Sequence, residues 1–144
     1  MSLEENKAII RKMYEVLNRR NLDSLDELIA PDYVDHTNHL KGLGEVKKFL
    51  TLLITGFSDF HETIEDIIAE DDKVWVHLRG TGTSNGEFRG LAPTGKKFTE
   101  ETVYIYRIVK GRVAESWAVQ NEEDLLIQLG VIEYTEKAKK LIPE

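Results

Sequence analysis

Residues 98–119 read FTEETVYIYRIVKGRVAESWAV, and this stretch decides the fold class. β-Branched and aromatic residues dominate both of its halves, which favours extended strands. Lys110-Gly111 forms a two-residue turn between the halves, so residues 98–109 and 112–119 predict an antiparallel hairpin. We therefore expect a mostly antiparallel sheet.

A second hairpin is predicted just before this one. From Phe60 the apolar period is two, since Phe60, Ile64 and Ile68 alternate with polar positions. Asp71-Asp72 then supplies a turn before an alternating run through Val74, Val76 and Leu78. The sheet is therefore expected to contain at least four strands.

The sequence before residue 60 has helical periodicity instead. Ser2 and Glu5 have capping-box spacing, and the apolar stripe behind them predicts a helix over residues 3–20. A short helix follows until Pro31, then a polar turn over residues 32–41, then a helix ending at Gly56. Another short helix is expected over residues 122–129. Helices grouped before strands predict an α+β domain, with the helices on one side of a curved sheet.

Length and composition restrict the class of protein. The 144 residues suit one domain, which we place at residues 1–132, followed by a charged tail at 133–144 that docks as a helix. The formal net charge of -7 argues against a nucleic-acid partner or an anionic membrane surface. No apolar run approaches the roughly 20 residues of a membrane span, and no secretory signal is recognisable. The cytoplasm is the expected compartment.

Two groups of polar residues are candidates for a site. Asp35, His36 and His39 lie in the polar segment after Pro31, either as a hydrogen-bonded Asp/His pair at a pocket edge or as a solvated loop. Their spacing lacks a strong metal-binding pattern, so no metal is expected. Glu115, Trp117 and Asn121 would share one face if the last strand stays extended.

The residues of that last strand have two interpretations. In one, Trp117 fills the core, Glu115 pairs with an arginine such as Arg107, and Asn121 caps the following helix. In the other, these polar groups enter an apolar cavity, where burial would disfavour the charged form of Glu115 and make it a proton donor.

The order and spacing of six motifs resemble the SnoaL-like polyketide cyclase family over about residues 3–130. The motifs are Pro31-Asp32-Tyr33-Val34-Asp35-His36-Thr37, Ile64-Glu65-Asp66-Ile67-Ile68-Ala69-Glu70, Pro93-Thr94-Gly95-Lys96, Ile105-Tyr106-Arg107, Val113-Ala114-Glu115-Ser116-Trp117 and Leu125-Leu126-Ile127-Gln128-Leu129-Gly130. The resemblance implies the cone-shaped nuclear transport factor 2-like fold, in which helices and a curved sheet enclose a pocket.

The resemblance also implies a chemistry. Members of the family are similar to aldol-type ring closers that use an aspartate as acid/base and need no metal or other cofactor. That aspartate corresponds to Asn121 here, and the histidine that usually precedes the tryptophan corresponds to Ser116. We predict His36, Glu115 and Asn121 as catalytic residues. The predicted pocket-lining residues are Tyr33, Trp75, Tyr104 and Trp117.

Two functions follow. The first is a cyclase-type enzyme that acts on a small apolar carbonyl compound. The second is a non-catalytic protein that binds a small hydrophobic ligand on the same scaffold, as a dimer. Large side chains on both faces of the strands, such as Trp75 opposite Val74 and Val76, predict a homodimer formed through the outer face of the sheet.

Overall fold

The computed structural model describes residues 2–142. Met1, Pro143 and Glu144, at the outer ends of the predicted domain and tail, lie outside the described residues. The helices are α1 (Leu3–Asn18), the 3₁₀ helix η1 (Leu22–Glu27), α2 (Leu43–Gly56), α3 (Glu122–Gln128) and α4 (Glu136–Lys139). The strands are β1 (Ile29–Asp35), β2 (Leu40–Lys41), β3 (His61–Glu70), β4 (Lys73–Thr83), β5 (Lys97–Val109) and β6 (Arg112–Gln120).

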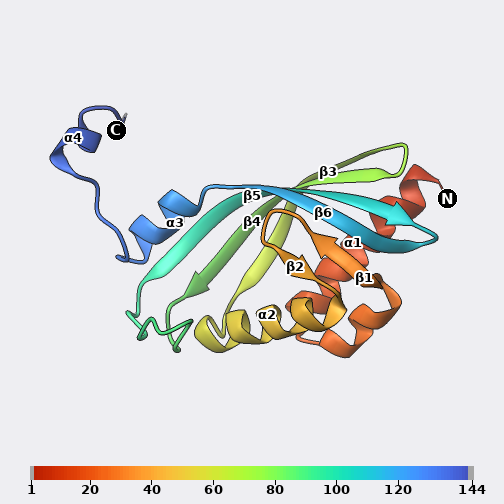
Figure 1. Ribbon diagram of the computed structural model, residues 1–144, viewed down its shortest axis with the longest axis horizontal. Coiled ribbons are helices and arrows are strands. Elements are labelled where there is room, and N and C mark those ends of the chain that lie inside the picture. Colours follow the sequence, from red (N-terminus) through yellow and green to blue (C-terminus); the bar gives the residue numbers. More distant parts are fainter. Residues whose placement is uncertain (1, 143–144) are drawn as a thin grey trace.

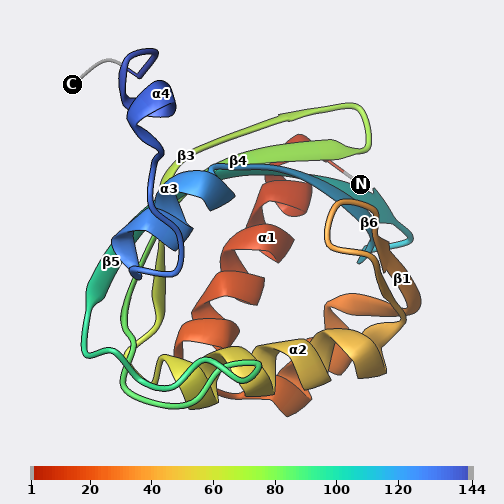
Figure 2. The same cartoon turned by 60° about the vertical axis from the view of Figure 1, so that its left-hand side comes forward.

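The six strands form one curved sheet in the order β2-β1-β6-β5-β4-β3 (Figure 1). All pairings are antiparallel except that of β1 with β6. Helix α1 lies within the curve of the sheet, and α2 crosses near one end of α1 (Figure 2). The predicted α+β class, with helices on one side of a mostly antiparallel sheet, is confirmed.

The predicted capping box starts α1. Ser2 Oγ accepts a hydrogen bond from the Glu5 amide at 3.0 Å, and the Glu5 carboxylate accepts one from the Ser2 amide at 3.4 Å. Behind this cap, Ile10, Met13 and Leu17 are buried against the sheet. The apolar stripe read from the sequence is therefore the face of α1 that forms the main core.

Strand β1 is the element that the sequence prediction missed. The turn expected over residues 32–41 is wrong, because Ile29–Asp35 pairs in parallel with β6 and Leu40–Lys41 pairs with β1. Pro31 hid the strand, since proline cannot donate to a ladder. The register shifts between Ile29 and Val34, so Pro31 lies in an irregular part of the pairing. Tyr33 and Asp35 then follow the two-residue period and are both buried.

A shift of register in β3 explains a second difference. Ile64 pairs with Leu78 and Asp66 with His77, so one extra residue lies between them on β3. Such a bulge reverses which face later side chains occupy. Ile68 is consequently 59% exposed on the face opposite Ile64, although the sequence gives both residues the same period.

The two faces of the sheet differ in composition. The inner face, toward α1 and α2, carries Val74, Val76, Leu78 and Tyr106, all buried. The outer face carries a cross-strand row of apolar residues. This row consists of Ile68, Trp75, Ile105 and Trp117.

The segment after α3 extends away from the sheet (Figures 1 and 2). Tyr134 Oη donates a hydrogen bond to Glu123 Oε1 at 2.6 Å, which joins this segment to α3. Helix α4 has no buried residue. None of the helices within residues 2–142 combines the length and the apolar character that crossing a membrane requires.

Candidate active site

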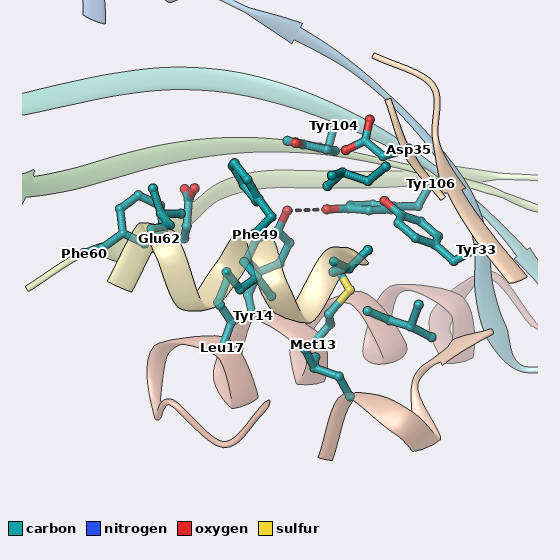
Figure 3. Close-up of a pocket in the computed structure, with 16 residues that line it drawn as sticks. Met13, Tyr14, Leu17, Tyr33, Asp35, Phe49, Phe60, Glu62, Tyr104 and Tyr106 are labelled. Atoms are coloured by element: carbon teal, nitrogen blue, oxygen red, sulfur yellow. Dashed lines mark hydrogen bonds between the residues drawn. The ribbon is translucent and has the colours of Figure 1, made fainter. Parts of the chain in front are cut away.

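Two pockets that share lining residues lie between the inner face of the sheet and the helices, and we name them the deep lobe and the outer chamber of the cavity. Figure 3 shows the residues that line the deep lobe. The deep lobe has a volume of about 120 Å³ and the outer chamber about 470 Å³. Five residues line both lobes and mark their junction: Phe49, Leu53, Phe60, Glu62 and Tyr104. Glu62 and Tyr104 are the polar members of this set, so they are the groups that a ligand spanning the junction would meet.

Tyrosines form the polar part of the deep lobe. Tyr14 and Tyr106 share a hydrogen bond between their hydroxyls, and the ring of Tyr106 stacks on that of Tyr104 with centroids 5.3 Å apart. Tyr33 is hydrogen-bonded to the buried hydroxyl of Ser116. Burial raises the pKa of all four phenols, so each stays neutral and keeps its hydroxyl hydrogen for a hydrogen bond.

A short polar network orients Tyr104. Asp35 accepts hydrogen bonds from the amides of Thr37 and Asn38 and from Asn38 Nδ2, the last at 3.0 Å. Asn38 Nδ2 also donates to Tyr104 Oη at 2.8 Å. Because Tyr104 is the acceptor in that bond, its own hydroxyl hydrogen is free to donate elsewhere. The network thus presents a phenol donor at the junction of the lobes.

Glu62 is the carboxyl at that junction. Its backbone is held by α1, because the Glu62 amide donates to Asn18 Oδ1 at 3.0 Å and Asn18 Nδ2 donates to Glu62 O at 2.8 Å. The carboxyl oxygen Oε2 is buried and has no hydrogen-bond partner among the described residues. Burial, and secondly the charge of Glu100, raise the pKa of Glu62 to about 8. Glu62 is therefore mainly protonated at neutral pH.

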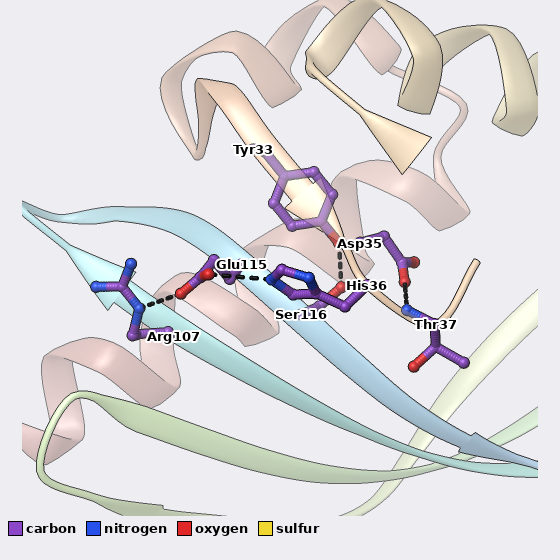
Figure 4. A network of polar contacts seen from close by, with 7 residues as sticks. All are labelled: Tyr33, Asp35, His36, Thr37, Arg107, Glu115 and Ser116. Carbon is purple, nitrogen blue, oxygen red and sulfur yellow. Dashed lines mark hydrogen bonds and ion pairs between the residues drawn. The ribbon is translucent and has the colours of Figure 1, made fainter. Parts of the chain in front are cut away.

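A different polar network occupies the outer face (Figure 4). Glu115 forms an ion pair with Arg107 and accepts from His36 Nε2 at 3.0 Å. The His36 ring stacks on Trp117 with centroids 5.0 Å apart. The hydrogen bond from Arg107, followed by that from His36, lowers the pKa of Glu115. Glu115 is thus a charged, half-buried carboxylate on the side away from the cavity.

The predicted site residues therefore separate into two groups. Tyr33 and Tyr104 line the cavity. Glu115, His36 and Trp117 cluster on the outer face, and Trp75 is 46% exposed there, so neither tryptophan is among the residues that line this cavity. Asn121 caps α3, accepting from the Asp124 amide at 3.1 Å, as one of the two interpretations predicted.

A bulge explains why the side chains of Glu115 and Trp117 point away from the cavity. Arg107 pairs with Glu115 and Ile108 with Val113, which leaves Ala114 as an extra residue in β6. Val113 and Ser116 are consequently the fully buried residues of β6, and Glu115 and Trp117 face outward. They do share one face, as predicted, but it is the face that the helices do not cover.

The sequence prediction missed Glu62 and Glu100, although a signal for both was present. Glu62 lies two residues from Phe60 and from Ile64, on a run with period two. Glu100 lies likewise between Phe98 and Thr102. A carboxyl group at a strand position where the two-residue period predicts an apolar side chain is a candidate for burial in a cavity. In the part of the chain that the structure describes, no three His, Asp or Glu side chains gather to hold a metal ion.

The fold is a curved, open sheet with helices packed inside the curve and a cavity between them. The sequence model of the SnoaL-like polyketide cyclase family matches residues 7–129. The chain therefore belongs to the SnoaL-like polyketide cyclase family.

Similar proteins include relatives described as cyclases and a structure, AclR, described as a hydroxylase. The nogalonic acid methyl ester cyclase of Streptomyces nogalater is 28% identical over 124 residues, which cover 82% of this chain and 92% of the relative. The crystal structure of IdmH from Streptomyces antibioticus is 31% identical, covers 88% of this chain and 99% of that chain, and has a TM-score of 0.75. AclR from Streptomyces galilaeus is 29% identical, covers 97% of this chain and 90% of that chain, and has a TM-score of 0.83.

Proposed function

We propose that this protein is a cyclase that closes a ring in a small apolar carbonyl compound by acid/base chemistry, with Glu62 as the general acid. Family membership supports the reaction class, and the named relative acts on a polyketide methyl ester. The site is the two-lobed cavity, whose walls are mostly apolar and aromatic.

The observation that carries this proposal is the neutral carboxyl of Glu62 inside that cavity. A carbonyl oxygen that gains negative charge during ring closure needs a proton donor within hydrogen-bond reach. Glu62 holds a proton at neutral pH because burial raises its pKa to about 8. Tyr104, with its free hydroxyl hydrogen, is a second donor at the same junction and can stabilise an oxyanion.

The catalytic roles expected for His36, Glu115 and Asn121 stay predictions. His36 and Glu115 would act only on a molecule bound at the outer face. Asn121 could acquire a role through Asn121→Asp, which keeps a capping side chain on α3 while adding a carboxyl group. Gain of cyclase activity in Asn121→Asp would support the correspondence with the aspartate of the family.

The decisive experiment is Glu62→Gln, assayed with nogalonic acid methyl ester as the probe substrate. Glutamine keeps the shape of the side chain but cannot transfer a proton, so kcat should fall about 10²- to 10⁴-fold. Glu65→Gln is the matched control, because Glu65 lies on the same strand but pairs with Arg79 at the surface. Full activity is expected for this control.

The non-catalytic alternative gives a different result. If wild type binds the probe but neither wild type nor Asn121→Asp converts it, the protein is a ligand-binding member of the family. Unchanged turnover in Glu62→Gln would instead show that another group is the acid. Binding is measured as a rise in the unfolding temperature, because a saturating ligand stabilises the folded state that it binds.

We also propose a homodimer formed through the outer face of the sheet. Ile68, Trp75 and Val119 are 59%, 46% and 68% exposed there, next to the half-buried Ile105 and Trp117. An exposed apolar row of this kind could pack against the same row of a second copy across a two-fold axis, as in a symmetric dimer. Light scattering should give twice the 16.5 kDa of one chain. Trp75→Lys should give the monomer, and a monomeric wild type at tens of micromolar would refute the dimer.

A further inference from the structure

We propose that Glu62 and Glu100 act as one proton-sharing pair across Gly80, in which Glu100 is the base and Glu62 the acid of ring closure. This inference rests on the proposed function, and it adds a second catalytic carboxyl that takes the proton from carbon. The argument starts from the strand register.

Gly80 lies directly between the two glutamates. It pairs with Glu62 on β3 and with Glu100 on β5, so the three residues form one cross-strand row. Neighbouring strands are about 4.8 Å apart, which places the two glutamate backbones roughly 10 Å from each other. Glutamate side chains that lean toward each other can span such a distance.

The absence of a side chain at position 80 allows this approach. A Cβ atom at Gly80 would lie 3.2 Å from Glu62 Oε2 and 3.4 Å from Glu62 Oε1. The Glu62 carboxyl therefore lies over Gly80, in the space between the strands that carry the two glutamates. Any larger residue at position 80 would push the Glu62 carboxyl away from this position.

Neither carboxyl has a counter-ion among the described residues. The ion pairs within residues 2–142 include neither Glu62 nor Glu100, and Glu62 Oε2 is without a hydrogen-bond donor. Two carboxylates in one cavity that form no ion pair cannot both ionise cheaply, so the two groups together retain one proton.

Among the described residues, the charged and titratable groups around Glu62 and Glu100 do not supply a positive charge that pairs with either carboxyl. Tyr14 faces the pair from α1 and Tyr104 from β5, and both phenols are neutral. Glu122 and Asp124 approach Glu100 from α3 and add negative charge. Arg89 is the cation of the chamber lining, and its guanidinium lies over the ring of Phe49 with 5.3 Å from Cζ to the ring centroid.

The positions of the two carboxyls assign their roles. Glu62 lines both lobes, whereas Glu100 lines only the outer chamber. The deeper group holds the proton because its charge is harder to solvate. Burial raises the pKa of Glu100 too, and the charges of Glu122 and Asp124 add to that rise, which a hydrogen bond from Thr102 opposes. Because Glu100 lines only the outer chamber, we assign to it the ionised state and the role of base.

The step balances within the site. The Glu100 carboxylate removes a proton from the carbon next to a substrate carbonyl, and that carbon bonds to the carbon of a second carbonyl. The π electrons of the second carbonyl move to its oxygen, which takes the proton of Glu62. Glu100 is then neutral and Glu62 charged, and transfer of one proton from Glu100 to Glu62 restores the pair.

The test compares Glu62→Gln, Glu100→Gln and Gly80→Ala, with Glu101→Gln as the control on the opposite, exposed side of β5. Two readouts are needed, which are kcat on nogalonic acid methyl ester and the carbon-13 NMR titration of the Glu62 carboxyl. Glu100→Gln should lower kcat about 10²- to 10⁴-fold and shift the Glu62 titration to lower pH. Gly80→Ala should alter the same titration, while Glu101→Gln changes neither readout.

Each outcome decides the matter. If Glu100→Gln leaves kcat or the Glu62 titration unchanged while Glu62→Gln abolishes turnover, the pair is overturned and the proposed function stands with Glu62 alone. If Glu62→Gln also leaves turnover unchanged, another group is the acid, and the role proposed for Glu62 fails together with the pair. Thermal unfolding of each variant distinguishes loss of activity from loss of the fold. Because Gly80→Ala removes no carboxyl, a shifted titration in that variant supports the pair independently of activity.

Discussion

The inner and outer faces of one sheet hold glutamates with opposite properties. On the inner face, Glu62 faces a mostly apolar cavity and has no ion-pair partner among the described residues, and burial raises its pKa to about 8. On the outer face, Glu115 pairs with Arg107 and His36, and these hydrogen bonds lower its pKa. The residue type is the same and both strands belong to one sheet, so the protonation state is set by the partners and by solvent.

This difference shows where proton chemistry can occur. A carboxylate held by a guanidinium has no proton to give and is stabilised against taking one. A carboxyl without partners in an apolar cavity keeps its proton near neutral pH and can transfer it. We therefore assign the proposed chemistry to the inner face and stabilising contacts to the outer face. The following predictions test this contrast, beginning with the largest expected effect.

Glu62 should make the folded protein less stable as the pH rises. Its folded pKa of about 8 lies above the ordinary value of 4.5, so the folded state binds the proton more tightly than the unfolded state. Its contribution to stability is complete below pH 4.5 and is lost as the pH rises to 8, over a span of at most about 5 kcal/mol. Glu62→Gln should remove this loss. In urea unfolding at pH 5, 7 and 9, the unfolding free energy of the variant should rise relative to that of wild type from each pH to the next.

A control and a contrary result sharpen this prediction. Glu65→Gln, on the same strand, should follow the pH dependence of wild type, because Glu65 is paired with Arg79 at the surface. If the unfolding free energies of Glu62→Gln and wild type stay parallel from pH 5 to 9, Glu62 is ionised in the folded state.

The substitutions Tyr33→Phe and Tyr134→Phe compare the loss of a buried hydroxyl with the loss of an exposed one. Tyr33→Phe leaves the fully buried hydroxyl of Ser116 without its partner, which should cost about 1–3 kcal/mol of unfolding free energy. Tyr134→Phe removes the exposed bond to Glu123 and should leave stability unchanged. Equal effects of the two substitutions in urea unfolding would mean that Tyr33 and Ser116 reach water.

Much of the fold was predictable because its signals are local. The capping box at Ser2 and the turn at Lys110-Gly111 each involve residues close in sequence, and the structure has both where they were expected. Strand β1 was not predictable in the same way, since Pro31 argues against a strand unless the irregular pairing with β6 is known. That pairing joins segments about 80 residues apart.

The candidate site was harder to predict, because bulges determine which face a residue occupies. The extra residue in β6 turns Glu115 and Trp117 outward, and nothing in the local sequence marks Ala114 as that residue. Tyr33 and Tyr104, both predicted as pocket residues, do line the cavity. Glu62 and Glu100 could have been identified from their two-residue spacing to Phe60 and Phe98 alone.

The smallest expected effect, with the opposite pH dependence, concerns Glu115. Its folded pKa is lowered, so its contribution to stability is present above the ordinary value of 4.5 and is lost as the pH falls through the folded pKa. The carboxylate is half-buried and reached by solvent, so the pair with Arg107 should contribute under about 1 kcal/mol. Glu115→Gln should therefore be slightly less stable than wild type at pH 7.

The measurement is the same urea series extended to acid. The difference between Glu115→Gln and wild type should shrink toward pH 3, as wild type loses its charged carboxylate, whereas that for Glu62→Gln grows toward pH 9. Glu136→Gln, a fully solvated carboxylate on α4, should follow wild type throughout. A Glu115→Gln variant that gained stability with rising pH would place both glutamates in the same environment, and the contrast between the two faces would be wrong. If Glu→Gln substitutions on the two opposite faces change the unfolding free energy with opposite pH dependence, the sheet separates neutral from charged carboxyl groups.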